Sequence, residues 1–151
     1  MNKYIINKDD TLLMLIDVQE KLFRVMSPEV QENLKKNCNI LMKTALEFNI
    51  PLIVTEQYRR GLGETIPELL SVAGAAPNLE KLHFDCMKDD TIRDAVISSG
   101  KKTIILSGIE SHICVFQTAL NLLDGGFNVI VADDAVGSRR KKDWRAALKA
   151  L

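Results

Sequence analysis

Two continuous apolar runs constrain the fold of this chain more than any other feature. Residues 11–16 (TLLMLI) and 103–106 (TIIL) carry no charge, and each run leads through a polar stretch into a helical pattern. A run that is apolar at every position is typical of a strand buried on both faces, as in a parallel sheet. Similar segments at 51–55 and 127–131, with a shorter one at 80–84, predict five strands in all.

Helical patterns separate these strands along the chain. The first begins at Ser27-Pro28-Glu29, a capping residue followed by proline and an acid, and keeps an apolar stripe as far as Phe48. Shorter helical segments follow at 65–70, from Asp89-Asp90 to a stop at Gly100, at 116–123, and in the last residues, from about Arg139 through Trp144 to Leu148. Regular alternation of strand and helix predicts an α/β fold: three α/β/α layers, Rossmann-like, around a central parallel sheet.

The length of 151 residues fits a single domain spanning 1–151. The 20 basic and 20 acidic residues cancel, so no basic surplus points to nucleic acid or to an anionic membrane. No apolar run approaches the roughly 20 residues that cross a bilayer. Three cysteines without a close pair fit a reducing compartment. We therefore expect a cytoplasmic protein that binds neither nucleic acid nor a membrane.

Cys114 is the candidate nucleophile. It follows the 103–106 run by a short turn and lies in the first turn of the next predicted helix, with Ser111 as a possible N-cap. The positive end of a helix dipole favours thiolate over thiol, and ligands of open α/β sheets bind at the carboxyl ends of strands. The alternative is that Cys114 is a small buried apolar residue, as Cys38 is expected to be in its helical stripe.

Other polar residues also follow or lie near the ends of the predicted strands. Asp17 ends the first apolar run, and a loop with hydrogen-bonding groups and glycines follows the second at 56–63. Lys81 stands near the beginning of the short 80–84 segment, where a lone lysine is usually just solvated. Loops at the carboxyl edge of a sheet often shape pockets, so these segments and Cys114 are expected at one rim.

Together these residues resemble the isochorismatase-like cysteine hydrolase superfamily. The matching motifs are Leu15-Ile16-Asp17-Val18-Gln19, Lys81 and the segment 108–115 (GIESHICV), and the stretches 54–58 and 61–63 resemble its isochorismatase-domain-containing subgroup. The resemblance covers nearly the whole chain and implies the isochorismatase-like hydrolase fold.

The resemblance also implies a catalytic triad of Asp17, Lys81 and Cys114. Cys114 would attack a carbonyl carbon and form a thioester-type intermediate, while Asp17 moves the proton and Lys81 supplies positive charge. The implied activity is cleavage of a C–N, amide-type bond in a small molecule, which is the expected partner, with no cofactor. Family members have a non-proline cis peptide that maps to Ile109–Glu110, and backbone N–H groups of this region, Ile113 included, would form the oxyanion hole.

The candidate pocket residues are aromatic or polar side chains near these motifs: Phe23, Gln57, Tyr58, Phe84 and His112. The phenylalanines have a core alternative, and His112 has a surface alternative. Nicotinamidases of the superfamily bind metal through an Asp and histidines after the second strand. Only His83 and His112 occur here, outside that loop, so no metal is expected. Isochorismatases themselves lack the cysteine.

Two other functions stay open at this point. The chain could be a catalytically silent binding or scaffold protein on the same fold, or a redox-sensing thiol protein, although no resolving cysteine is evident. Family members typically continue with another strand and helix after the segment matching 144–151. Either the chain is truncated or a partner covers that edge, and relatives are often dimers or larger, so we expect a homo-oligomer.

Overall fold

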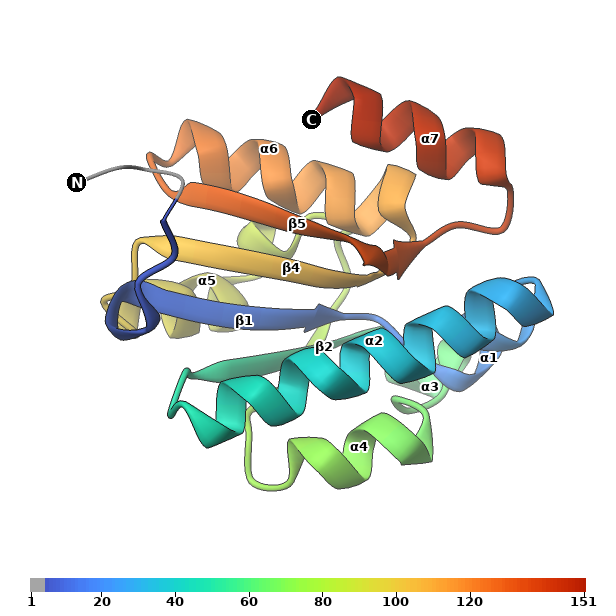
Figure 1. The fold of residues 1–151 in the computed structure, drawn as a ribbon, viewed down its shortest axis with the longest axis horizontal. Coiled ribbons are helices and arrows are strands. Elements are labelled where there is room, and N and C mark those ends of the chain that lie inside the picture. The colour runs from blue at the N-terminus through green and yellow to red at the C-terminus, as the bar shows by residue number, and fades with distance from the viewer. Residues whose placement is uncertain (1–4) are drawn as a thin grey trace.

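The apolar runs form a parallel sheet in the computed structural model, which describes residues 5–151 (Figure 1). In this part of the chain the sheet has five strands in the order β3-β2-β1-β4-β5, and every neighbouring pair is parallel. Every residue of β1, the central strand, is buried, which explains its unbroken apolar sequence. The strands are β1 (Thr11–Ile16), β2 (Leu52–Gln57), β3 (Asn78–Lys81), β4 (Thr103–Ile109) and β5 (Asn128–Gly137).

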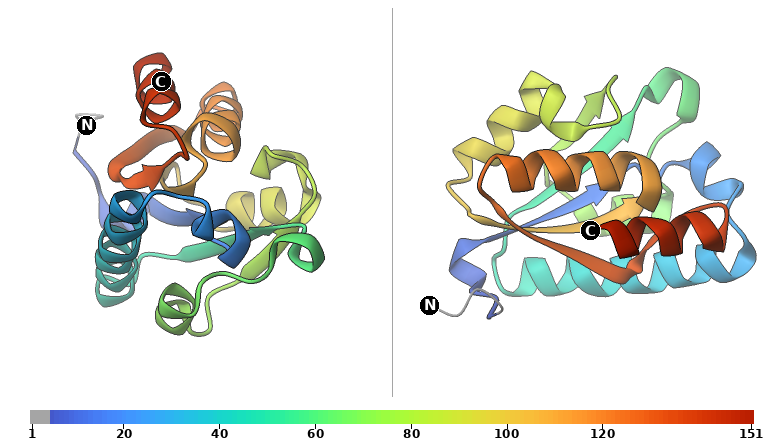
Figure 2. Two further views of the ribbon diagram at one scale, coloured as in Figure 1. Left: turned by 90° about the vertical axis from the view of Figure 1, so that its right-hand side faces the viewer. Right: turned by 90° about the horizontal axis from the view of Figure 1, so that it is seen from above.

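Helices cover both faces of the sheet and complete the expected three layers (Figure 2). Helices α2 and α4 pack on one face, and α5, α6 and α7 pack on the other. None of the helices in residues 5–151 combines the length and the apolar character needed to cross a membrane. The helices are α1 (Glu20–Arg24), α2 (Pro28–Glu47), α3 (Arg59–Leu62), α4 (Pro67–Ala73), α5 (Asp90–Ser98), α6 (Phe116–Asp124) and α7 (Lys141–Ala150).

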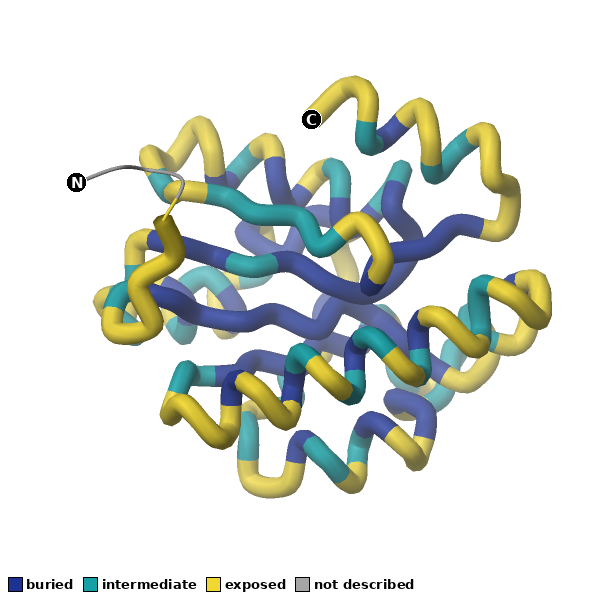
Figure 3. The backbone as a smooth tube through the Cα atoms, in the orientation of Figure 1, coloured by how far each residue is buried: buried dark blue, intermediate teal, exposed yellow. Residues whose placement is uncertain are grey.

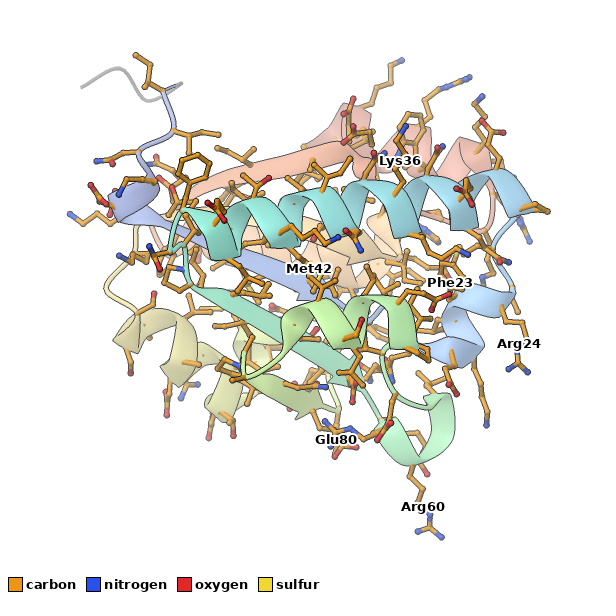
Figure 4. All side chains as sticks on the ribbon, turned by 60° about the horizontal axis from the view of Figure 1, so that its bottom comes forward. Phe23, Arg24, Lys36, Met42, Arg60 and Glu80 are labelled. Atoms are coloured by element: carbon orange, nitrogen blue, oxygen red, sulfur yellow. The ribbon has the colours of Figure 1, made fainter. Side chains whose placement is uncertain are left out.

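Two apolar clusters, one on each face, hold the layers together. On the α2 side, Leu34, Cys38 and Met42 face Leu13 and Leu15 of β1, and Figure 4 shows Met42 lying between α2 and α4. Burying one such side chain stabilises the fold by roughly 1.5–3 kcal/mol. Figure 3 shows that burial is concentrated in the sheet and on the inner sides of the helices. The framework that carries the carboxyl edge of the sheet is therefore well packed.

The third strand differs from its prediction. It spans Asn78–Lys81, so Lys81 is its last residue and the segment that follows leaves the sheet. The backbone N–H groups of Leu82 and His83 donate to the Asp89 side chain and not to β2. Because the carboxyl group of Asp89 replaces the strand partner, β3 ends at Lys81 and places that lysine at the carboxyl edge.

The segment after β4 also differs from its prediction. Residues Ser111–Val115 form a π-helical turn, and α6 begins only at Phe116. Glu110 is the residue that precedes the turn, and the buried hydroxyl of Ser111 has no hydrogen-bond partner. The prediction that Ser111 caps the helix was therefore wrong. Cys114 lies in the π-helical turn, close to its junction with α6.

Candidate active site

Asp17, Lys81 and Cys114 meet at the carboxyl edge of the sheet. Asp17 directly follows β1, Lys81 ends β3, and Cys114 lies in the turn after β4. Lys81 Nζ reaches across the end of β2 to Asp17 Oδ2 at 2.7 Å, and both side chains are fully buried. Cys114 is buried, with 6% of the residue exposed, and the charge of the Asp17 carboxylate raises the pKa of its thiol. A carboxylate, an ammonium and a thiol therefore share this edge of the sheet.

Asp17 is held firmly in this position. Its backbone φ of 52° is left-handed, a conformation that costs free energy for any residue with a side chain. Its N–H donates to the carbonyl of Thr55 at 3.1 Å, and its Oδ1 accepts from the Thr55 hydroxyl at 2.8 Å. Thr55 therefore fixes both the backbone and one carboxylate oxygen, leaving Oδ2 for Lys81.

The Lys81 ammonium contacts four oxygens. Besides Asp17 Oδ2, these are Gln57 Oε1 at 2.7 Å and the carbonyls of His83 and Phe84 at 3.0 and 3.1 Å. The Gln57 oxygen and the two carbonyls accept hydrogen bonds and occupy all three N–H donors of the ammonium, whereas Asp17 Oδ2 makes an ion pair without hydrogen-bond geometry, so no donor is left for a substrate. Lys81 acts on its surroundings through its charge and not through a free donor.

The loop after Lys81 is attached to the helix that follows Cys114. Asp85 Oδ2 accepts from Asn121 of α6 at 2.6 Å, and the N–H of Cys86 donates to the Thr118 hydroxyl at 3.0 Å. The same loop supplies two of the carbonyls around Lys81. These contacts connect the surroundings of the lysine to the helix that positions the cysteine.

Burial and mutual charge shift the pKa of each group in the site. Burial raises the pKa of the Asp17 carboxyl, although Lys81 opposes this. Burial alone would lower the pKa of Lys81, but the Asp17 carboxylate and then Cys86 and Cys114 outweigh it, so its pKa is raised and the ammonium stays charged. Burial and the Asp17 carboxylate raise the pKa of the Cys114 thiol. The expectation that the helix start favours the thiolate was therefore wrong, because the cysteine is buried beside a negative charge.

The chain reaches Cys114 through a tight crossing. Gly108 has φ 114°, and a Cβ there would lie 2.0 Å from the carbonyl oxygen of Ile16. Only glycine lets β4 pass this closely beside the end of β1. The Ile109–Glu110 peptide is cis. The N–H of Ile113 donates to the Glu110 carbonyl at 3.0 Å. This N–H is therefore not free to donate to an oxyanion.

Side chains beyond the cis peptide bind the turn to the end of β5. Glu110 accepts from the backbone N–H of Arg139 at 3.1 Å and from its Nε at 2.8 Å. The Nδ1 atom of His112 lies 2.9 Å from the Ser138 hydroxyl. His112 therefore contacts the segment between β5 and α7, and its role in a substrate pocket stays a prediction.

The other predicted pocket residues lie in three different surroundings. Phe23 packs against the apolar cluster beneath α2 and α4, whereas the neighbouring Arg24 extends into solvent (Figure 4). The Gln57 amide contacts Lys81. Tyr58 and Phe84 are about half exposed, at 49% and 53%, at the ends of β2 and β3. Their place in a substrate pocket stays a prediction.

Cys114 lines neither of two hollows of the surface. A groove of about 470 Å³ lies between the start of α2, the end of β5 and the start of α7, and none of the three triad residues lines it. A smaller hollow of about 290 Å³ lies beside Phe84 and Gln117, the latter three residues beyond Cys114. Within residues 5–151, no group of three or more His, Cys, Asp or Glu side chains could hold a metal ion.

Sequence reasoning missed Thr55 and the two carbonyls around Lys81. Thr55 had a usable signal, since it is a polar residue near the end of a buried apolar run and pairs in register with Ile16, just before Asp17. The carbonyls of His83 and Phe84 had none, because any residue type supplies a backbone oxygen.

Comparison with known proteins agrees with this fold and these motifs. The family model described as Isochorismatase domain matches residues 11–151. Isochorismatase domain-containing protein 2 of Danio rerio is 38% identical over 144 residues, which cover 93% of this chain and 70% of the relative.

Two solved structures share the architecture. A MAR1 ribonuclease from Caenorhabditis elegans has a TM-score of 0.87 and 36% identity, covering 95% of this chain and 73% of the other. The YcaC protein of Escherichia coli, described as an octameric hydrolase of unknown specificity, has a TM-score of 0.90 and 28% identity, covering 97% and 73%. The expected three-layer α/β fold and the expected family are both confirmed, and the chain belongs to the isochorismatase domain family.

Proposed function

We propose that this protein is a hydrolase that cleaves an amide-type C–N bond of a small molecule through a covalent intermediate on Cys114. The observation that carries this proposal is the buried ion pair of Asp17 and Lys81 at the carboxyl edge of the sheet, with the turn that carries Cys114 beside it, where the charge of Asp17 raises the pKa of the Cys114 thiol. The Escherichia coli relative, described as a hydrolase, supports the reaction class. Clusters of groups with shifted pKa values are typical of catalytic sites.

The first half-reaction follows from the protonation states. Cys114 is a neutral thiol at rest, because its pKa is raised, so the nucleophile must be formed as the substrate is attacked. Asp17 takes the thiol proton while Cys114 sulfur bonds to the carbonyl carbon. The tetrahedral intermediate then collapses to a thioester, the C–N bond breaks, and Asp17 returns the proton to the leaving amine.

The second half-reaction uses the same groups. Asp17 takes a proton from a water molecule and the hydroxide attacks the thioester carbon; the C–S bond then breaks, and Asp17 gives its proton to the departing sulfur, which releases a carboxylic acid and restores the Cys114 thiol and the Asp17 carboxylate. The positive charge of Lys81 favours the ionised form of Asp17 between these steps. The raised pKa of Asp17 makes its carboxylate a better proton acceptor than an ordinary aspartate, which suits a group that accepts a proton and returns it.

The experiment is a turnover screen of small primary amides and ureides with matched cysteine variants. Cys114→Ala should lower turnover by about 10⁴-fold or more, whereas Cys38→Ala, a buried cysteine on the opposite face, should retain it. Ammonia release measures the rate, and mass spectrometry of Cys114 peptides measures the acyl intermediate. Undiminished turnover of a true substrate by Cys114→Ala would refute the nucleophile.

Alternatives are tested in the same screen. A catalytically silent binding or scaffold protein would turn over nothing while keeping its fold. A single-stranded RNA belongs in the panel because the Caenorhabditis elegans relative is called a ribonuclease, and RNA cleavage that persists in Cys114→Ala would replace the amide proposal. Self-association is also proposed, supported by the octameric Escherichia coli relative. The cytoplasmic location and the small-molecule partner stay predictions.

A further inference from the structure

The contacts of the Lys81 ammonium show how its position is set. Asp17 supplies the charged contact through Oδ2 at 2.7 Å, and two carbonyls of the following loop supply backbone oxygens. The remaining oxygen is Oε1 of Gln57, at 2.7 Å. Among the described residues, Gln57 and Asp17 are thus the two whose side chains hold this ammonium.

The Gln57 amide has one orientation that satisfies its neighbours. Oε1 accepts from Lys81 Nζ, while Nε2 donates to the carbonyl of Leu82 at 2.9 Å. A reversed amide would place its NH₂ group against the ammonium and its oxygen against a carbonyl, so both contacts would become repulsive. The hydrogen-bond network therefore determines which end of the amide faces the lysine.

A second glutamine holds the backbone of Gln57. The fully buried Gln19 accepts the Gln57 N–H through Oε1 at 2.7 Å and donates from Nε2 to the Gln57 carbonyl at 2.9 Å. Its Nε2 also donates to the Gly63 carbonyl at 2.7 Å. Because Gln19 lies two residues after Asp17, the segment that carries the proposed base also fixes the residue that holds the lysine.

We propose that Gln57 is a positioning residue, whose amide oxygen holds the Lys81 ammonium against the Asp17 carboxylate. Sequence reasoning placed Gln57 in the substrate pocket, but both ends of its amide are engaged with residues 81 and 82. Its importance for catalysis rests on the proposed function, whereas the contact with Lys81 does not depend on turnover.

A neutral acceptor suits this position better than a charged one. The amide oxygen localises the ammonium without a second negative charge, so Asp17 remains the carboxylate that faces Lys81. The other titratable groups around the ammonium are the thiols of Cys86 and Cys114. A carboxylate at position 57 would share the lysine charge with Asp17, and it would disfavour the negative forms of both Asp17 and Cys114.

The first test follows proton exchange between water and the Lys81 ammonium by ¹⁵N NMR. Gln57→Ala should speed this exchange by about tenfold, as expected for the loss of one hydrogen bond to a charged group. Gln57→Glu, which keeps an oxygen in the same place, should keep the exchange slow. Gln31→Ala is the matched control, because the Gln31 amide also donates to a backbone carbonyl, that of Met26, but on α2. Unchanged exchange in Gln57→Ala would overturn the proposal.

The second test measures how fast iodoacetamide alkylates Cys114 as a function of pH. Gln57→Glu should move the alkylation profile to higher pH, and Gln31→Glu should leave it in place. An unmoved profile in a folded Gln57→Glu protein would overturn the electrostatic role of position 57. This test does not depend on whether Gln57→Ala folds. If Gln57→Ala frees the ammonium while the wild-type protein turns over no amide, the positioning role stands and the hydrolase proposal falls.

Discussion

Cys38 and Cys114 are two buried cysteines on opposite faces of one sheet, and their surroundings differ in kind. Cys38 lies on α2 among Leu34 and Met42, and its thiol donates to the carbonyl of Ala135 at 3.4 Å. Burial raises its pKa to about 12. Cys114 is buried next to the Asp17–Lys81 ion pair. Both thiols are protonated at neutral pH, so burial alone does not distinguish a nucleophile from a core residue.

The difference between the two regions is a base. Cys38 has a carbonyl as its hydrogen-bond partner, which accepts a hydrogen bond but does not take a proton. Cys114 has a carboxylate whose own pKa is raised by burial and which a lysine keeps in place. Burying an ion pair costs desolvation free energy that the apolar face does not incur. At the carboxyl edge, the buried charges that the proposed chemistry needs therefore reduce the stability of the fold.

The largest expected effect comes from breaking the ion pair. Lys81→Met should lower the free energy of unfolding by about 3–5 kcal/mol, because Asp17 would stay buried without its partner. The double variant Lys81→Met, Asp17→Leu should recover much of this loss, since no unpaired charge remains. Urea denaturation measures both. A double variant as unstable as the single one would contradict the account of Asp17 as an uncompensated charge.

The same ion pair predicts that the free energy of unfolding depends on pH in the alkaline range. The folded state raises the pKa of Lys81 above its ordinary value of 10.5, so its contribution to stability is fully present below that value. The contribution is lost as pH rises through the higher folded-state pKa. Unfolding free energies measured across this alkaline range should fall in the wild-type protein. The fall should be smaller in Lys81→Met, and equal slopes would argue against a stabilised ammonium.

Asp17→Asn should separate turnover from thiol reactivity. Turnover should fall by about 10³-fold or more, because the proposed base is lost. Alkylation of Cys114 by iodoacetamide at pH 8 should instead become severalfold faster, since Lys81 remains while the negative charge that opposes the thiolate is gone. Peptide mass spectrometry follows Cys114, with Cys38 as the internal control. Slower alkylation would indicate that Asp17 favours the thiolate in the resting protein.

The smallest expected effect is on the apolar face. Cys38→Ala should lower the free energy of unfolding by about 1–2 kcal/mol, from lost packing and a small cavity. It should leave turnover and the alkylation rate of Cys114 unchanged. Thermal unfolding and the amide screen check this variant. A large loss of activity in folded Cys38→Ala protein would mean that the two regions are coupled through the sheet.

The sequence by itself determined the sheet and the approximate place of the site. Runs that are apolar at every position are typical of strands in a parallel sheet, so the sheet and its two helical layers followed from local pattern, although the last strand, β5, lies at an edge and its first five residues are only partly buried or exposed. Polar residues that end such strands, Asp17 above all, lie at the carboxyl edge by the same geometry. These properties depend on neighbours in sequence, and sequence therefore reveals them.

Only the tertiary structure decided what the polar residues do there. Lys81 became the partner of Asp17 because Asp89 ends β3 at position 81 and Gln57 turns the ammonium inward. The Cys114 thiol stays protonated because burial beside a carboxylate outweighs the start of a helix. Desolvation and the distance between charges depend on groups brought together from remote parts of the chain, and no local pattern encodes them.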